Sequence, residues 1–401
     1  MIKLNYAEYD SCSPDDKKKY IQRMVDKCAA LGKGKVVVPK GTWLSGPIHL
    51  QSNIELHLCE DSVISFSDIP EDYLPVVFTR WEGMECYNYS PLIYAKDCEN
   101  VAITGNGCLV GNGKNWWSWK KLQQKAADEL CYAESNKIPV EERIYGTRQA
   151  ALRPSFIQFV NCKKILLEDF TIEDGPQWTI HPVYCEHIVV KHVNVKTMGP
   201  NTDGLNPDSC EHVRIEGCTF QTGDDCIAIN SGMNEDGWRV NRPCRDVTIT
   251  NCEMHGGHGA IVIGSGMSGG VEHIYASDCR ICNTMQGIRI KSMRGRGGYV
   301  TDVLFENMEI NNVSEEAIQV SMDYPYSTVI PRSDIPPIFD GITIRNIHGT
   351  AAKQAMVLLG LKDSHIKNLK LENIEIKAEM PDVVKYVTAL NTYIDQSKRG
   401  C

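Results

Sequence analysis

Three aspartates in two short fragments of the chain stand where they could act together. Asp203 and Asp224 lie 21 residues apart, and a predicted strand follows each of them. In a chain that coils about every 20–30 residues, such positions stack on neighbouring turns, and neighbouring strands lie about 4.8 Å apart. Asp224 and Asp225 are adjacent, so a regular strand would point them to opposite faces. A bend at Gly223 would let both reach one surface.

Three carboxylates on one small surface cannot all be ionised without cost, so we expect the pKa of at least one to rise. Such an arrangement supplies an acid and a base at the same pH. Asn201 and Asp203 are two residues apart, as are Arg289 and Lys291, so each pair points to one face of an extended chain. His258 lies between these pairs in the sequence.

The fragments that hold these residues, taken in order, resemble the signature of the polygalacturonase family, glycoside hydrolase family 28. The resemblance covers most of the chain and looks closest to exo-acting bacterial members. The fragments are Asn201-Thr202-Asp203, Gly223-Asp224-Asp225, Gly257-His258-Gly259 and Arg289-Ile290-Lys291, joined by Trp116-Trp117, Arg153-Pro154, Trp178-Thr179-Ile180-His181-Pro182 and Ile263-Gly264-Ser265.

The resemblance implies an all-β fold, a single-stranded right-handed parallel β-helix, and hydrolysis of α-1,4-galacturonosyl bonds with inversion. It implies that Asp224 is the general acid and that Asp203 and Asp225 activate the attacking water. His258 would support the acid. Arg289 and Lys291 would bind a galacturonate carboxylate.

Further substrate contacts are expected from Asn201, Tyr324, His181 and Arg153. Tyr324 lies where family members often place a tyrosine in the cleft. His181 has a second interpretation as a histidine whose hydrogen bonds are simply satisfied. Inversion requires room for a water molecule, so the carboxyl groups are expected about 6.5–9.5 Å apart.

Composition limits the other classes of function. The 401 residues carry a net charge of −9, which argues against a nucleic-acid partner. A polyanionic pectic substrate would therefore need local cations such as Arg289 and Lys291. No apolar run reaches membrane-spanning length, and neither a metal nor a cofactor is expected.

The predicted location is cytoplasmic. Residues 1–13 lack a basic segment followed by an apolar core, so we see no signal peptide. The 17 cysteines are then expected as thiols in a reducing compartment. The repeated ones are interpreted as small buried hydrophobic residues stacked at one corner.

A repeat predicts one solenoid domain over residues 1–401. Its copies begin with a small or apolar residue and two polar ones before an alternating apolar run, and their spacing is unequal, which favours coils with variable loops. They include Cys98-Glu99-Asn100-Val101, Cys162-Lys163-Lys164-Ile165, Cys185-Glu186-His187-Ile188, Cys210-Glu211-His212-Val213, Cys244-Arg245-Asp246-Val247 and Val271-Glu272-His273-Ile274.

Two segments fall outside this repeat. Residues 1–34 are predicted as an N-terminal cap region, with an amphipathic helix that starts at Ser13-Pro14-Asp15-Asp16. Residues 113–153 form a long insertion. Its three tryptophans and its arginines have two compatible interpretations: a helix that covers a strand edge, or a wall of the cleft with aromatic rings for sugars and cations for carboxylates.

Two motifs are interpreted as decoys. Gly264 to Gly269 spells G-x-G-x-x-G, but the segment after it has strand periodicity, whereas a dinucleotide site needs a helix there. Cys279 to Cys282 spells C-x-x-C without a second pair for zinc, so it is predicted to be structural.

Four functions remain in competition. The first is a galacturonan hydrolase. The second, a close variant, would cut rhamnogalacturonan, although the presence of both Arg289 and Lys291 favours galacturonate. The third is a pectate lyase, which would use calcium on the three aspartates. The fourth is a non-catalytic solenoid that binds glycans.

We predict the hydrolase, acting from the non-reducing end and releasing single galacturonate units. A cytoplasmic enzyme would meet oligomers and not polymer. The 113–153 insertion is long enough to close one end of a groove.

Overall fold

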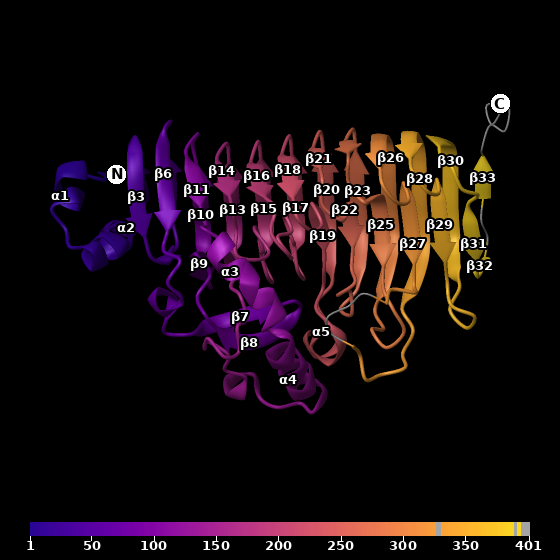
Figure 1. Ribbon diagram of the computed structural model, residues 1–401, viewed down its shortest axis with the longest axis horizontal. Coiled ribbons are helices and arrows are strands. Elements are labelled where there is room, and N and C mark those ends of the chain that lie inside the picture. Colours follow the sequence, from indigo (N-terminus) through magenta and orange to yellow (C-terminus); the bar gives the residue numbers. More distant parts are fainter. Residues whose placement is uncertain (326–329, 389–390, 394–401) are drawn as a thin grey trace.

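The chain winds into a single-stranded parallel β-helix, as the resemblance implied. The computed structural model describes residues 1–325 and 330–388, and the backbone of 391–393. Successive coils follow one another along the long axis, from indigo N-terminal coils to yellow C-terminal ones (Figure 1). Over the described ranges, the coils follow one another without a break.

The first face of the solenoid is a parallel sheet with one strand from each coil. Its strands are β2 (Gly34–Val38), β5 (Ile54–Leu58), β10 (Glu99–Thr104), β13 (Lys163–Glu168), β15 (Glu186–Lys191), β17 (Glu211–Glu216), β20 (Cys244–Thr250), β23 (Val271–Ser277), β26 (Tyr299–Val313), β28 (Ile338–Ala351) and β30 (Ile366–Lys377). The short β1 (Ile2–Lys3) pairs with β2, and β32 (Val387–Thr388) and β33 (Asn391–Tyr393) pair with β30.

The second face continues from the first around a corner. Its short strands are β3 (Gly41–Ser45), β6 (Ser62–Phe66), β11 (Cys108–Val110), β14 (Thr171–Glu173), β16 (Asn194–Thr197), β18 (Thr219–Thr222), β21 (Glu253–His255) and β24 (Arg280–Cys282). In the last coils β26, β28 and β30 are long enough to run through both faces.

The third face carries the candidate functional residues. Its strands are β4 (Ile48–His49), β9 (Ile93–Lys96), β12 (Ile157–Val160), β19 (Ile227–Ile229), β22 (Gly259–Ile263), β25 (Gln286–Lys291), β27 (Ile318–Ser321), β29 (Met356–Leu359) and β31 (Val383–Lys385). Single parallel bridges from Ile157 through Ile180 and Leu205 to Ile227 connect β12 to β19.

The core is a set of apolar columns inside the coils, because residues at equivalent strand positions stack in register. One column on the first face is Val101, Ile165, Ile188, Val213, Val247, Ile274, Val303, Ile342 and Leu369. All nine are buried. Their strict alternation with polar neighbours is the pattern that predicted the strands.

A ladder of thiols stands at the corner before the first face. Cys162, Cys185, Cys210 and Cys244 are buried on four successive coils, and Cys98 is half-buried on the coil before them. The thiol of Cys185 donates to the carbonyl oxygen of Phe159 at 3.3 Å. All 16 cysteines in the described ranges are free thiols, so the structure agrees with the hydrophobic interpretation.

The N-terminal end of the solenoid is covered by helix α2 (Pro14–Ala29), as predicted. The backbone N–H of Asp16 donates to Oγ of Ser13 at 3.2 Å, and Pro14 occupies the first turn. A short helix, α1 (Tyr6–Asp10), also forms there, and the sequence analysis missed it.

A lateral body lies along one side of the N-terminal half of the solenoid, below it in Figure 1. The 113–153 insertion contributes α3 (Lys114–Trp117), η2 (Ser118–Lys121), α4 (Gln124–Ser135) and η3 (Val140–Glu142). The antiparallel hairpin of β7 (Val77–Trp81) and β8 (Met84–Asn88), preceded by η1 (Pro70–Tyr73), packs with them, as does α5 (Asn234–Val240).

The insertion's aromatic residues pack internally, which corrects the expectation that they present rings to sugars. Trp116 is 1% exposed and Trp119 9%, with ring centroids 5.0 Å apart. The indole N–H of Trp117 donates to the carbonyl oxygen of Gly175. Arg143 is buried against Asp236, and Arg148 pairs at the surface with Glu71. These residues hold the lateral body together.

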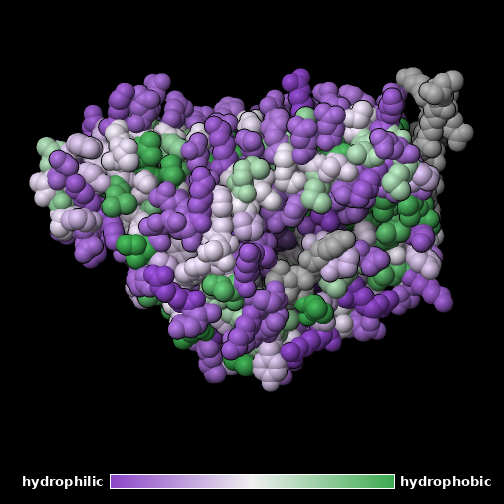
Figure 2. Space-filling model, viewed as in Figure 1, coloured by the Kyte–Doolittle hydropathy of each residue, from purple (hydrophilic) through white to green (hydrophobic). Residues whose placement is uncertain are grey.

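The hydropathy of the surface and of the helices is relevant to membrane association. Figure 2 shows hydrophilic residues over most of the visible face, with hydrophobic ones scattered singly or in small groups. Among residues 1–325 and 330–388, no helix has the length and apolar character needed to cross a membrane.

Candidate active site

A cavity of about 770 Å³ lies on the outer side of the third face. On β19, β22 and β25 the isoleucines point into the core, whereas Ala228, Val262 and Arg289 form an outward column in register. The lining residues are Glu82, Gly83, Lys120, Trp178, Met198, Gly199, Pro200, Asn201, Asp203, Gly223, Asp224, Asp225, Ala228, Asn230, Met233, His258, Gly264, Ser265, Gly266, Met285, Gln286, Arg289, Lys291, Glu315, Tyr324 and Lys353.

The three aspartates meet in this cavity. One carboxylate oxygen from each of Asp203, Asp224 and Asp225 lies within 4.8 Å of the other two. Asp203 and Asp225 are almost fully buried, and the side chain of Asp224 is 16% exposed. The oxygens are closer than the range of about 6.5–9.5 Å that is usual between the carboxyl groups of inverting enzymes.

Two glycines make this meeting possible. A Cβ at Gly223 would lie 2.2 Å from the carbonyl oxygen of Gly199 on the preceding coil. Gly257 has φ +74°, and a Cβ there would lie 2.1 Å from the carbonyl oxygen of Asp224. The expected bend at Gly223 therefore coincides with a close approach of backbones that a larger residue would block.

Each carboxylate has a different set of donors. Asp225 accepts from the backbone N–H of Gly259 at 2.8 Å and from Nζ of Lys291 at 2.7 Å. Asp224 lies 2.9 Å from Nδ1 of His258 and accepts from the backbone N–H of Asp225 at 3.0 Å. Asp203 accepts from Nδ2 of Asn206 at 2.8 Å.

These surroundings separate the pKa values of the carboxyls. Burial and the charges of Asp224 and Asp225 raise the pKa of Asp203 well above its ordinary value, which meets the expectation that one must rise. Burial also favours a higher pKa for Asp224. The hydrogen bond and charge of His258, together with the charge of Lys291, outweigh this effect, so the pKa of Asp224 is lowered. The hydrogen bond with Asp224 raises the pKa of His258.

The resemblance assigned the acid to Asp224, whereas the pKa of Asp203 is the one that is raised and that of Asp224 is lowered. An acid at Asp224 would need a proton from a neighbouring group. His258, hydrogen-bonded to it, and Asp203, within 4.8 Å, are the neighbouring groups that can supply one.

Two cations face the carboxylates from β25, which lies two coils beyond the coil of Asp224 and Asp225. The Nε–H of Arg289 donates to Oε1 of Gln319 at 2.8 Å, which fixes the direction of the guanidinium group. Tyr324 lies beside both cations: its ring centroid is 5.3 Å from the Arg289 guanidinium carbon and 5.1 Å from the Lys291 ammonium. Arg289, Lys291 and Tyr324, three of the residues expected to contact substrate, thus lie in one part of the cavity.

Arg153 and Asn201 form a support for Asp224. Nη2 of Arg153 donates to Oδ1 of Asn201 at 2.8 Å, and Nδ2 of Asn201 donates to Oδ2 of Asp224 at 3.4 Å. Asn201 lines the cavity, whereas Arg153 is 0% exposed. The predicted contact of Arg153 with substrate is therefore corrected: its charge positions Asn201 from behind.

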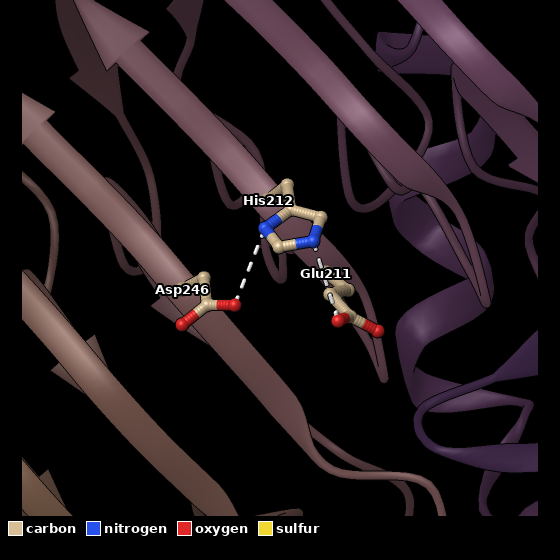
Figure 3. A group of neighbouring side chains, drawn as sticks. All are labelled: Glu211, His212 and Asp246. Atoms are coloured by element: carbon tan, nitrogen blue, oxygen red, sulfur yellow. Dashed lines mark ion pairs between the residues drawn. The ribbon is translucent and has the colours of Figure 1, made fainter.

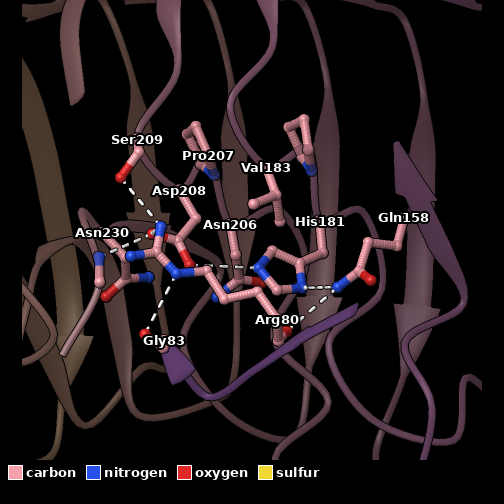
Figure 4. A network of polar contacts seen from close by, with 12 residues as sticks. Arg80, Gly83, Gln158, His181, Val183, Asn206, Pro207, Asp208, Ser209 and Asn230 are labelled. Atoms are coloured by element: carbon pink, nitrogen blue, oxygen red, sulfur yellow. Dashed lines mark hydrogen bonds and ion pairs between the residues drawn. The ribbon is translucent and has the colours of Figure 1, made fainter. Parts of the chain in front are cut away.

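His181 lies in a buried network on the same face, outside the cavity lining (Figure 4). Gln158 donates to its Nδ1 at 2.8 Å, and its Nε2 lies 3.5 Å from Asp208. Burial lowers the pKa of His181, against the effect of Asp208. Of the two interpretations left open, the geometry agrees with the histidine whose hydrogen bonds are satisfied.

Several wall residues were missed by the sequence analysis. Glu82 and Gly83 form the turn of the β7–β8 hairpin, Met233 precedes α5, and Glu315 and Lys353 come from later coils. None belongs to a fragment of the family signature, and a hairpin turn far away in the sequence gives no local signal that it will reach a cleft.

A second group of acidic and imidazole side chains lies on the exterior (Figure 3). His212 stands between Glu211 and Asp246, with ring nitrogens 3.3 and 3.2 Å from their carboxylates. Arg245 donates to Glu211 at 2.8 Å, and the ring of His187 stacks on His212. Ion pairs and stacking between coils thus account for this group.

The decoy motifs behave as predicted. The segment after Gly264 to Gly269 forms strand β23, so no helix offers its N-terminus to a dinucleotide. Cys279 precedes β24 and Cys282 is its last residue, in register with His255 and Asn311 of the neighbouring coils.

The fold and the carboxylate cluster beside two cations define a β-helical enzyme of the acid–base type. The chain belongs to the glycosyl hydrolases family 28, whose sequence model matches residues 28–394. It is thus a glycoside hydrolase.

Similar proteins agree with this assignment. A probable polygalacturonase of Vitis vinifera is 29% identical over 364 residues, which span 88% of this chain and 68% of the relative. The crystal structure of a hyperthermoactive exopolygalacturonase from Thermotoga maritima is 35% identical with a TM-score of 0.90, covering 98% of this chain and 92% of that one. A family 28 exopolygalacturonase of Yersinia enterocolitica, 22% identical, shares the fold with a TM-score of 0.79 over 100% of this chain and 77% of its own.

Proposed function

We propose that the protein is a polygalacturonase that acts on pectic oligogalacturonides from their non-reducing end, releases galacturonate and inverts the anomeric configuration. Family membership and the polygalacturonases to which the chain is similar support the reaction. The predicted cytoplasmic location stays a prediction.

One observation carries the exo mode. The hairpin turn of Glu82 and Gly83 lines the cavity beside Gln177, on the coil that precedes Asp203, and Lys120 of the insertion lines it too. These residues form a wall on the N-terminal side of the aspartates. On the other side, the lining continues past Arg289 to Lys353 on the coil of β29. Such a cleft suits one sugar unit on the walled side and a longer chain on the other.

The mechanism follows from the donors of each carboxylate. Asp224, the most exposed of the three, gives a proton to the glycosidic oxygen as its bond to C1 breaks. Asp203 and Asp225 hold water, which forms the new bond to C1 and gives its proton to one of these two carboxylates. Lys291 and Arg289 bind the uronate carboxylate next to the scissile bond, so the leaving unit is oriented.

Inversion rests on the family resemblance alone, because the oxygens lie closer together than the separation that usually accompanies it. Proton NMR during the first minutes of hydrolysis tests it. Inversion gives the β-anomer first from an α-linked substrate. An α-anomer that appears first and then mutarotates would contradict this part of the proposal.

A time course with polygalacturonate tests the exo mode. We expect monomer from the first samples and a slow fall in viscosity. Rapid loss of viscosity with oligomers of intermediate length would mean that the groove accepts the middle of a chain.

The lyase alternative fits the donors less well. Lys291 lies 2.7 Å from Asp225, so an ammonium occupies the place where a calcium ion would need that carboxylate. Absorbance from an unsaturated product, abolished by chelator, would favour the lyase. For a rhamnogalacturonan hydrolase, the same digests would release no galacturonate from homogalacturonan.

A further inference from the structure

We infer that Glu82 selects the end of the substrate chain: its carboxylate accepts a hydrogen bond from the C4 hydroxyl of the non-reducing terminal galacturonate, and its charge and position exclude a further uronate unit. This inference rests on the proposed function.

Glu82 is a nearly buried acid that reaches the cavity. It is 8% exposed, with φ 44° in the turn between β7 and β8, and it lines the cavity with Asp203 and Asp224. Its Oε1 accepts from Nε2 of Gln177 at 3.1 Å. Since a carboxylate offers about four acceptor positions, this single bond leaves acceptors for a sugar hydroxyl.

The position of Glu82 is fixed by a chain of buried contacts. Gln177, 2% exposed, accepts from the indole N–H of Trp81 at 3.0 Å. On the other side of the turn, the carbonyl oxygen of Gly83 accepts from Nε of Arg80 and from the backbone N–H of Met233, both at 3.1 Å. A site whose supporting groups are already ordered loses little entropy when it binds.

Arg80 fastens this turn to the solenoid (Figure 4). Its Nη1 donates to Oδ1 of Asp208 and to Oγ of Ser209, both at 2.9 Å, and all three side chains are 0–1% exposed. Its guanidinium group also lies 4.9 Å from the ring centroid of Tyr184. The hairpin that carries Glu82 is therefore tied to the coils that carry the aspartates.

Charge gives Glu82 a second effect. Burial raises the pKa of Glu82, while Lys120 and Arg153 act in the opposite direction. A terminal galacturonate places a neutral hydroxyl at C4, whereas a longer chain would place another sugar and its carboxylate there. An ionised Glu82 would repel that second carboxylate, and a protonated Glu82 still occupies the place of the further sugar. A chain end is therefore accepted and a chain interior is rejected.

Matched oligogalacturonides test this role. A saturated trimer carries the C4 hydroxyl, and a trimer from lyase digestion, with a 4,5-unsaturated non-reducing unit, lacks it. We expect the wild-type kcat/KM to favour the saturated trimer by about 10²-fold or more, since sites built around a hydroxyl reject analogues without it. In Glu82→Gln and Glu82→Ala the preference should fall at least tenfold. Glu315→Gln, in the opposite wall, should keep the wild-type ratio.

Each outcome decides the inference. An unchanged ratio in both Glu82 variants, or a wild-type enzyme that does not discriminate, overturns it. Trimers whose reducing end has been reduced with borohydride test the other chain end. If the Glu82 variants change kcat/KM only for these trimers, Glu82 contacts the reducing end, and the inference is also overturned. If the wild type releases no galacturonate from the saturated trimer, the proposed function itself has failed. Circular dichroism checks the fold, and the isosteric Gln variant decides if the Ala variant does not fold.

Discussion

The ammonium group of Lys291 lies 2.7 Å from Oδ2 of Asp225, and both side chains are less than 10% exposed. Although burial opposes its charge, the carboxylate of Asp225 raises the pKa of Lys291. The lysine therefore fixes Asp225, one member of the proposed water-holding pair, while it also faces the cavity. Arg289 instead donates to the neutral side chain of Gln319. Lys291 is thus tied to a carboxylate of the aspartate cluster, whereas Arg289 is not.

Replacing each of the two cations should show this difference. Lys291→Ala leaves Asp225 buried without its ion pair, so we expect a fall of about 10²–10³ in kcat together with a higher KM. Arg289→Ala should act mainly on KM. Steady-state kinetics on charged and methyl-esterified oligomers check this. Equal effects of the two variants on kcat would contradict a special link between Lys291 and Asp225.

Asp224→Asn should lower kcat by about 10²–10⁴, the usual contribution of a general acid. The amide keeps the shape of the side chain, so folding and substrate binding should change little. Calorimetric titration with a galacturonate trimer and circular dichroism provide the controls. A kcat within a few-fold of the wild type would remove Asp224 from the acid role.

Stability should fall as pH rises from 4.5 to about 8 because of Glu134 in α4. Burial raises its pKa from 4.5 to about 8, although its Oε1 accepts from Nδ2 of Asn234 at 2.8 Å. The folded state thus holds this proton more tightly than the unfolded chain. Its stabilising effect is complete below the unfolded value of 4.5 and is lost as pH rises through about 8.

Thermal unfolding from about pH 6 to about pH 9 measures this effect. Glu134→Gln keeps a hydrogen-bonding side chain without a titrating proton, so its Tm should depend less on pH than that of the wild type. Parallel curves for the two proteins would mean that any loss of stability over this pH range arises elsewhere.

Arg80→Met should destabilise the protein by about 3–5 kcal/mol, because it leaves Asp208 buried without its partner. Arg148→Met is the matched control: its ion pair with Glu71 is more than half exposed on both sides and should contribute at most about 1 kcal/mol. Urea unfolding of both variants measures the difference. Similar losses in the two would show that the Arg80 pair contributes no more than a surface contact.

The sequence was sufficient for the coils and for the centre of the site. Apolar and polar residues alternate strictly along the strands, and each coil adds one strand to a face. The spacing of Asp203 and Asp224 therefore predicted that they lie on neighbouring coils, as the strand pairing shows. The roles of His258, Arg289 and Lys291 came from the family resemblance, and the structure places all three in the same cavity.

The walls of the cleft could not be predicted in the same way. Glu82 reaches the site because Arg80, two residues earlier, pairs with Asp208, which lies 128 residues further along the chain. Arg153 and His181 belong to fragments that resemble the family signature. Both side chains are nevertheless buried, and neither lines the cavity. Position in a motif does not tell whether a side chain touches the ligand or holds a neighbour that does.

The thiol ladder makes the opening of individual coils measurable. Cys162, Cys185, Cys210 and Cys244 are each 0% exposed, so an alkylating reagent reaches them only when the surrounding coil opens. In a solenoid each coil contacts only its neighbours, and opening can spread from an end. The order in which the four thiols become labelled, read by mass spectrometry of peptides, would therefore trace the direction in which the helix unwinds.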